Sequence, residues 1–573
     1  MTLTEVTDEK PGVSGSESSS SDTAAANDAA TEPSTEPTYP NTFSLFLICL
    51  GLFLSVLCFG LDRTIITTAV PKITRDFNSL EDIGWYHSAY MLTSCCFQLP
   101  FGKLYAELDV KWLYLFSLVI FEVGSVLCAA APNSVVLIVG RAIAGVGAAG
   151  LICGVFVIIA FCAPLHNRPR ITGMVGGAMG VAQIIAPTLG GALTDYVSWR
   201  WCFWINLPMG AVTFVAVAFL VNIPKADTSA KREKKPKYEG LAGIARRFDL
   251  AGTAFLLPAI VSLLLALQWG GTEYAWGSWR VVLTLVVFGV AIVIWCGIQY
   301  RSGDNATVPL RIVKGRSMLS AIWFMFCIMG VLIIIVQYVT IWFQASLGIS
   351  AYQSGVNLLA TSVPMSFTFI AAGFLTSKIG YYVPQMIGCT ILSSVATGMI
   401  TRFSLETSKA YWIVSLLLTG IGIGLGAQQP LTIPQVVLTN ADVSLGTSVV
   451  IFSQTLSGTV WVSVANNIFH DRLVSELTTR VPTVDPDVVV AAGANGIAET
   501  LGHIYPDEIG AILKAYDAAL GHVWIIIVSL ACLSVFGLFT EWKSVKQQVS
   551  NAAKVEEGAG GDGKDTQNKG NDA

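Results

Sequence analysis

The sequence predicts an all-α membrane protein with about fourteen transmembrane helices, and three observations lead to this fold class. Of 573 residues, 53% are hydrophobic and only 13% are charged, a composition far more apolar than that of a soluble protein. Apolar runs of about twenty residues, the length that crosses a hydrocarbon core of about 30 Å, recur along the chain. Acidic residues gather in the tails and outer loops, whereas basic residues stand beside particular runs.

The predicted spans form two groups of six with an extra pair between them. Spans 1 to 6 fall within residues 42–222. Span 1 starts near residue 43, spans 2 to 4 lie at 85–104, 113–131 and 135–161, and spans 5 and 6 share the stretch 176–210. Spans 7 and 8 fall within 249–300 and flank a loop rich in Trp and Tyr, which suits a membrane interface. The remaining spans fall within 301–541, at 317–342, 355–375, 382–400, 411–426, 444–469 and after a loop at 470–520.

Polar segments suggest which side of the membrane each loop occupies. Residues 1–41 and 542–573 hold little that is large and apolar, so we expect disordered tails there. A hydrophilic loop at 223–248 separates the first six spans from the extra pair. Lys and Arg gather after spans 4, 6 and 8, which places these loops and both termini in the cytoplasm by the positive-inside rule. The loop at 470–520 is then extracellular.

Charged residues lie inside or at the end of three apolar runs: Asp62, followed by Arg63, in span 1, Glu122 in span 3 and Arg141 in span 4. A charge at the centre of a membrane costs about 3 kcal/mol, so it usually has a partner or a function. Arginine cannot neutralise itself, so Arg141 needs water or a carboxylate. Because a buried carboxyl changes its protonation with its surroundings, Asp62, Glu122 and Arg141 are candidates for proton coupling or gating. The alternative is that they anchor helices.

Span 5 is dense in small residues and contains a proline. Gly173, Gly176, Gly177, Gly180 and Ala182 recur at helical spacing, so a neighbouring helix can approach closely. Proline has no amide hydrogen and clashes with the preceding turn, so we expect the helix to kink or break at Pro187 and at the Gly190-Gly191 pair.

Other motifs exclude several classes of function. The string Gly145 to Gly150 matches a dinucleotide fingerprint, but it lies inside span 4 with no strand before it. A phosphate-loop-like string in the tail has Asp565 where Ser or Thr should stand. The twelve cysteines lie in apolar runs and favour core packing over disulfides or zinc. We expect no enzyme activity, cofactor, metal, ATP or nucleic-acid partner.

Several motifs together resemble the major facilitator superfamily, in particular the fourteen-span drug:proton antiporter group that includes filamentous-fungal toxin efflux pumps. The matching stretches are Leu61 to Ile65 with Pro71, Arg141 with Gly145 and Gly147, Ala186 to Gly191, Trp199 to Trp201, Ile205 to Pro208 and the aromatic loop 269–279. Three positions depart from the usual pattern. Ala106 replaces an aspartate, Asp109 replaces a glycine, and Ala186 replaces the first core glycine of the antiporter motif.

The resemblance implies two six-helix bundles around a central cavity that opens alternately to each side, with spans 7 and 8 as the extra pair. It assigns Gly180, Pro187, Gly190 and Gly191 to the antiporter motif. Amides inside other spans are candidates for lining the cavity, although bonding between helices is the commoner use. The candidates are Gln183, Gln337, Asn357 and Gln428.

The function implied is proton-coupled export of hydrophobic or amphipathic small molecules, a toxin, another secondary metabolite or a drug. We expect a monomer in the plasma membrane, with the vacuolar membrane as the second choice of location. A carrier of siderophores or basic amino acids is an alternative, but basic cargo would need more carboxylates. A non-transporting membrane sensor is an alternative of another class, which a large soluble domain would favour.

Overall fold

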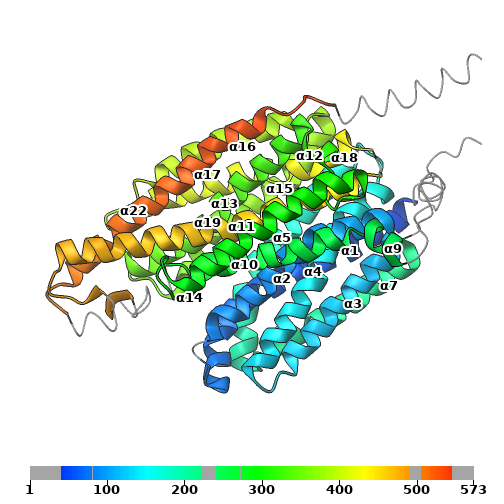
Figure 1. Ribbon diagram of the computed structural model, residues 1–573. Coiled ribbons are helices and arrows are strands. Elements are labelled where there is room, and N and C mark those ends of the chain that lie inside the picture. Colours follow the sequence, from blue (N-terminus) through cyan, green and yellow to red (C-terminus); the bar gives the residue numbers. More distant parts are fainter. Residues whose placement is uncertain are drawn as a thin grey trace, which may run out of the picture. The chain divides into compact units, whose positions relative to one another are not determined.

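The computed structural model describes residues 41–79, 82–221, 241–271, 273–439, 441–486, 488–490 and 505–544, and its regular elements there are helices (Figure 1). The tails expected at 1–41 and 542–573 lie almost entirely outside these residues. Of the hydrophilic loop expected at 223–248, only the part from residue 241 onward is described.

Seven helices carry the first six predicted spans. They are α1 Thr42–Phe77, α2 Ile83–Glu107, α3 Val110–Ala129, α4 Ser134–Cys162, α5 Arg168–Tyr196, α6 Trp201–Trp204 and α7 Asn206–Leu220. Polar side chains accept hydrogen bonds from free N–H groups at several helix starts. Asn41 caps α1, and Asp109 caps α3 through the N–H groups of Lys111 and Trp112. Asp109, unusual for the resembled family, thus starts a helix.

The extra pair consists of α10 Leu250–Trp269 and α11 Trp279–Ser302, with the short helix α9 Leu241–Arg247 before it. Helix α10 packs against α11 and α2, and it also contacts α19. Cys95 and Cys96 of α2 join Leu256 and Ile260 of α10 in one apolar cluster, as expected of cysteines used for packing. Helix α11 buries only 11% of its most apolar window, so most of it is left to face lipid.

The C-terminal half follows a 3₁₀ turn at Gly303–Asn305 and the short helix α12 Leu310–Val313. Its helices are α13 Arg316–Ala345, α14 Ala351–Asn357, α15 Leu359–Ile379, α16 Val383–Ile400, α17 Lys409–Gly426, α18 Gln429–Val437, α19 Val443–Arg480 and α22 Ile509–Leu533, ending in a 3₁₀ turn at Ser534–Leu538. Helices α13, α19 and α22 pack against one another, and α15, α16 and α17 form a second group.

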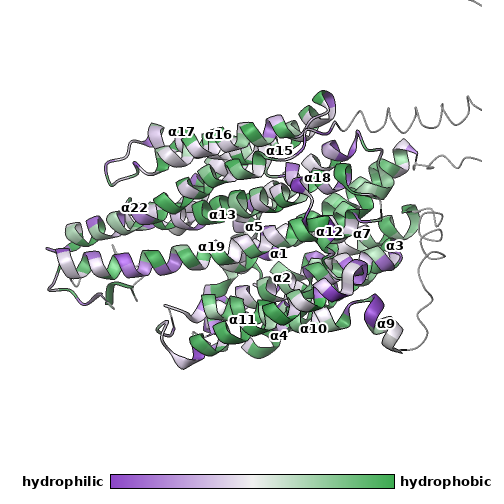
Figure 2. Cartoon of the chain, turned by 45° about the horizontal axis from the view of Figure 1, so that its top comes forward, coloured by the Kyte–Doolittle hydropathy of each residue, from purple (hydrophilic) through white to green (hydrophobic). Residues whose placement is uncertain are grey.

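Thirteen helical segments of the described chain are long and apolar enough to cross a membrane. The predicted second span, α2, has 25 residues but is not among them. Its polar residues explain the difference, because Gln98 and Lys103 are buried against other helices instead of facing lipid. Figure 2 shows the long helices as mostly hydrophobic, with hydrophilic residues concentrated toward helix ends and connections.

Two expectations about helix ends were wrong. Helix α5 does not break at Pro187 or at Gly190-Gly191 but continues to Tyr196. A break inside the membrane would leave several backbone groups without hydrogen bonds, whereas proline removes only one. The loop expected at 470–520 is shorter, because α19 continues to Arg480 and α22 begins at Ile509. Leu473 and Leu477, one helical turn apart, pack against α22 and extend the helix beyond the apolar run.

The N-terminal and C-terminal halves meet most extensively through two helix pairs, α5 with α15 and α2 with α19, and α4 also contacts α19. A Cβ at Gly173 would lie 2.6 Å from the carbonyl oxygen of Phe369, so the backbones of α5 and α15 are in direct contact. The close approach predicted from the small residues of span 5 is therefore present. In the other pair, Thr455 of α19 donates a hydrogen bond of 3.5 Å to Gln98 of α2.

Candidate functional site

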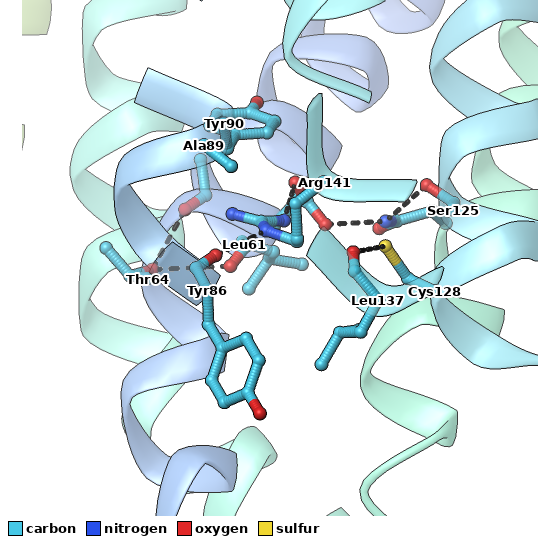
Figure 3. Close-up of polar contacts among 12 residues, drawn as sticks. Leu61, Thr64, Tyr86, Ala89, Tyr90, Ser125, Cys128, Leu137 and Arg141 are labelled. Carbon is cyan, nitrogen blue, oxygen red and sulfur yellow. Dashed lines mark hydrogen bonds and ion pairs between the residues drawn. The ribbon is translucent and has the colours of Figure 1, made fainter. Parts of the chain in front are cut away.

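The charges predicted in spans 1 and 4 form an ion pair inside the N-terminal half. Nη1 of Arg141 on α4 lies 2.7 Å from Oδ2 of Asp62 on α1, and both side chains are fully buried. Figure 3 shows the Arg141 guanidinium at the centre of the polar contacts, close to Leu61 of α1. The sequence required a carboxylate or water for Arg141, and the carboxylate is Asp62.

Helix α2 completes the surroundings of the guanidinium. Nε of Arg141 donates to the carbonyl oxygen of Tyr86 at 3.0 Å. The Tyr90 ring lies 4.3 Å from the guanidinium carbon, and Figure 3 shows it on one side of Arg141. A cation against an aromatic face is stabilised, the more so when both are away from water. Arg141 is thus held by α1 and α2 together, and Nη2 has no partner among the described residues.

Asn206, at the start of α7, reaches the second oxygen of Asp62. Its Nδ2 lies 3.4 Å from Asp62 Oδ1 and 3.2 Å from Ser125 Oγ on α3. Its own oxygen is buried with no partner among the described residues. Asn206 was not among the predicted site residues, although it stands in one of the motifs that carry the resemblance. Its signal in the sequence is that it is the one amide side chain of span 6.

Glu122 lies near this pair without joining it. It stands on α3 one turn before Ser125, and its two carboxyl oxygens are buried with no hydrogen-bond partner in the described part of the chain. Gly210 of α7 lies directly against the carboxyl group, since a Cβ there would overlap Oε1. The three predicted charges are therefore collected on neighbouring helices, two of them paired and the third unpaired.

The residues of the antiporter motif face different neighbours along α5. Gly180 lies against Ser366 of α15 in the C-terminal half, whereas Gly190 lies against Ile65 of α1. A Cβ at Gly191 would meet nothing within 4 Å, and Pro187 is exposed. Helix α5 thus contacts the site helix α1 at one end and the opposite half of the molecule at the other.

The four amides predicted for a cavity lie on different helices and have different surroundings. Gln183 on α5 is half-buried and Gln337 on α13 is exposed. Asn357 at the end of α14 accepts a 3.4 Å hydrogen bond from Gln353. Gln428, between α17 and α18, is buried against Gly176 of α5. Of the four, Gln428 is placed as a contact between the two halves.

An apolar groove lies elsewhere, between α1 and α7. It has a volume of about 420 Å³, and none of the predicted site residues lines it. Its walls are Leu47, Leu50, Gly51, Ala211, Val212, Val215, Ala216 and Leu220. All twelve cysteines are free, and no metal-binding cluster of His, Cys, Asp or Glu occurs in the residues that the structure describes.

Comparisons with known proteins identify the family. The model of the Major Facilitator Superfamily matches residues 52–462. The MFS-type efflux pump MFS1 of Arthroderma benhamiae is 45% identical over 497 residues, which cover 87% of this chain and 91% of that protein. The efflux pump aflT of Aspergillus parasiticus is 44% identical, covering 88% and 96%. The aspyridones efflux protein of Neocamarosporium betae is 42% identical, covering 90% of each chain.

Solved structures agree on the fold. The proton:xylose symporter XylE superposes with a TM-score of 0.55 at 13% identity, covering 89% of this chain and 99% of that chain. The human organic anion transporter MFSD10 gives 0.53 at 14% identity, covering 85% and 98%. Such low identities support the fold alone. The chain therefore belongs to the Major Facilitator Superfamily as a multi-pass membrane transporter, not an enzyme, and is closely related to fungal efflux pumps.

Proposed function

We propose that this transporter is a proton-coupled efflux pump that exports hydrophobic or amphipathic small molecules, such as a toxin, another secondary metabolite or a drug. Three relatives similar over nearly their whole length are named as efflux pumps, and one of these names specifies aspyridones. Thirteen helical segments of the described chain each contain a long apolar stretch, which suits hydrophobic or amphipathic cargo.

The observation that carries proton coupling is the buried Asp62–Arg141 pair with Glu122 beside it. A proton gradient drives transport only if protonation changes the balance between inward-open and outward-open states. A change of charge beside this pair would alter the attraction between Asp62 and Arg141, which joins α1 to α4. The helices would then favour a different arrangement, which is the differential binding that coupling needs.

Helix α5 offers a route from this site to the other half of the molecule. Gly190 contacts α1, which carries Asp62, and Gly180 contacts α15. A shift of α1 therefore changes the packing of α5 on the C-terminal half. We assign Pro187 and Gly191, which face open space at the same end of α5, to the wall of the transport cavity together with Gln183, Gln337 and Asn357.

The proposed location is the plasma membrane, with both termini in the cytoplasm. The support for the orientation of the termini is the placement of Lys and Arg after the predicted spans 4, 6 and 8. The proposed acting unit is a monomer, because all groups of the proposed coupling site come from one chain.

The test is the accumulation of the fluorescent dye ethidium in cells that express the protein, with and without a protonophore. We expect expressing cells to accumulate less dye than empty cells, and we expect the protonophore to abolish the difference. Arg141→Ala should raise accumulation to the level of empty cells. Arg480→Ala is the matched control, because Arg480 pairs with Glu476 at an exposed end of α19.

Two outcomes would contradict the proposal. If lowered accumulation persists in the protonophore, the pump does not use the proton gradient. If Arg141→Ala, present in the membrane at the level of Arg480→Ala, still lowers accumulation, the buried pair is not part of the coupling machinery.

A further inference from the structure

The unpaired carboxyl of Glu122 distinguishes it from Asp62. Asp62 has Arg141 on one oxygen and Asn206 on the other, so its surroundings stabilise the ionised form. Both oxygens of Glu122 are buried and lack a hydrogen-bond partner among the described residues. An isolated carboxylate is very unfavourable in an apolar interior, whereas a neutral carboxyl is tolerated there. The arrangement therefore fits an ionised Asp62 and a protonated Glu122.

The two carboxyls lie against the same face of α7, at positions one helical turn apart. Asn206 bonds to Asp62, and Gly210, one helical turn later, lies against the Glu122 carboxyl. Asn206 also bonds to Ser125, one turn beyond Glu122 on α3. In the described part of the chain, the Asn206 oxygen is a buried acceptor without a partner, and a protonated Glu122 is a donor without a partner. Both groups thus lie along the contact between α3 and α7, one helical turn apart.

Few other charged or titratable groups surround Glu122. Helix α7 carries none, and Cys202 of α6 faces Thr194 of α5 instead. The groups that face Glu122 or the adjoining pair from the remaining neighbours are Cys58, Asp62 and Arg63 on α1, His87 and Tyr90 on α2 and Arg141 on α4, and Cys128 faces the pair from α3 itself.

We propose that Glu122 is the group that carries the exchanged proton, while Asp62 and Arg141 remain a charged pair that responds to it through Asn206. This inference deepens the proposed proton-coupled export and rests on it. On release, the O–H bond of the Glu122 carboxyl breaks, the proton passes to water, and a carboxylate is left facing α7. The new charge lies close enough to Asp62 to repel it and so to weaken its hold on α7 and Arg141. Asn206 is a positioning residue in this scheme, because it acts by holding Asp62.

The first measurement needs no cargo. Infrared difference spectra of the purified full-length chain in lipid nanodiscs, recorded between acidic and alkaline buffer, report the C=O stretch of a protonated carboxyl. We expect a buried-carboxyl band with a component that is lost in Glu122→Gln and kept in Asp62→Asn, while any component from the half-buried Asp517 of α22 is kept in both. Glu476→Gln, at the exposed end of α19, is the control and should leave the band unchanged. The proposal is overturned if the band is absent from the unsubstituted protein or if no component of it is lost in Glu122→Gln.

The second measurement separates proton driving from cargo movement. In proteoliposomes, Glu122→Gln should lower ethidium transport driven by a pH gradient by about tenfold or more, within the range of ordinary coupling free energies. Exchange of ethidium at equal pH on both sides should continue, because a glutamine mimics the protonated carboxyl. Gradient-driven transport at the unsubstituted rate in Glu122→Gln would overturn the inference. A different result would contradict the proposed function instead: an infrared band that depends on Glu122, together with transport by the unsubstituted protein that does not respond to a pH gradient.

Asn206→Ala tests the positioning role in the same assay. It should shift the pH at which gradient-driven transport is half-maximal, an effect that a purely structural change does not predict. An unchanged pH profile with a lower rate would show that Asn206 only stabilises the fold.

Discussion

The two halves of the molecule place their charges differently. In the N-terminal half, Asp62 and Arg141 form an ion pair in the membrane interior, with both side chains completely buried. In the described C-terminal half, the ion pairs lie at helix ends, and the Arg311 side chain, paired with Asp442, is 51% exposed. Most side-chain hydrogen bonds of the interior there join neutral groups, such as Thr390 with Ser534 at 2.9 Å, although the half-buried Asp517 of α22 also has one buried oxygen without a partner among the described residues. Neutral hydrogen bonds do not change with proton concentration, and the fully buried ion pair lies in the N-terminal half, so that is the half to which we assign the proposed response to a proton gradient.

The largest expected effect comes from breaking the buried pair. Arg141→Ala leaves Asp62 without its cation, which should destabilise the protein by about 3–5 kcal/mol. The double variant Asp62→Asn with Arg141→Gln should recover most of this stability but not gradient-driven transport, because it removes both charges. Thermal unfolding of the purified protein checks the first part and ethidium efflux the second. If the thermal unfolding midpoint of Arg141→Ala is as high as that of Arg311→Ala, the buried pair of the N-terminal half contributes no more to stability than the Arg311–Asp442 pair of the C-terminal half.

A pair of glycine substitutions tests how tightly the site is packed. Gly210→Ala places a methyl group on the Glu122 carboxyl, so we expect a loss of about 1–3 kcal/mol and a weakened response to the pH gradient. Gly458→Ala on α19 is the matched substitution in the C-terminal half, since its Cβ would meet Ile333 at an ordinary 3.5 Å. Its effect on the unfolding midpoint should stay within about 0.5 kcal/mol. Equal losses would mean that Gly210 has only a general packing role.

The exposed pair of the C-terminal half should contribute less. Arg311→Ala should cost at most about 1 kcal/mol, and less at high salt, because half-exposed pairs are screened by water and ions. The hydrogen bond to Asp442, opposed by desolvation, raises the pKa of Arg311. A raised pKa in the folded state means that this stabilisation is complete below the ordinary arginine range and is lost only as the pH rises beyond it. Unfolding midpoints in low and high salt at neutral pH measure the effect, and a salt-independent loss would contradict it.

The smallest effect is expected where the extra helices touch α19. Nε1 of Trp276, in the aromatic loop between α10 and α11, donates to Asn467 Oδ1 at 3.2 Å. Trp276→Phe keeps an aromatic ring and removes this donor, so the loss should be about 1 kcal/mol or less. Transport should continue at close to the unsubstituted rate. A loss of transport comparable to that of Arg141→Ala would show that the extra pair takes part in the cycle.

Much of the architecture could be read from the sequence because lipid restricts what a backbone may do. Apolar length predicts where helices cross, and the two six-span groups with an extra pair follow from counting them. The same reasoning failed where apolar length was a poor guide. Helix α2 buries polar side chains inside protein, and α19 continues beyond its apolar run because Leu473 and Leu477 pack against α22.

The candidate site was predictable only in part. A charge inside a membrane needs an explanation, so Asp62, Glu122 and Arg141 stand out in the sequence without any structure. Gln337 and Asn357 show the limit of this reasoning. An uncharged amide inside a span can line a cavity or bond to a neighbouring helix, and the sequence does not distinguish the two roles. Neither is drawn into the buried network around Arg141.

By itself, the sequence determined which residues needed partners. A charged side chain inside an apolar span is costly in any fold unless it is paired, because the cost comes from removing the charge from water. Only the tertiary structure decided which partners they found. Asp62 and Arg141 are 79 positions apart, and Asn206 lies 144 positions from Asp62, so no local pattern links them. Packing of α3 against α7 left Glu122 without a hydrogen-bond partner among the described residues, whereas Asp62 is bonded through both of its oxygens, and our proposal of different roles for the two carboxyls rests on this difference.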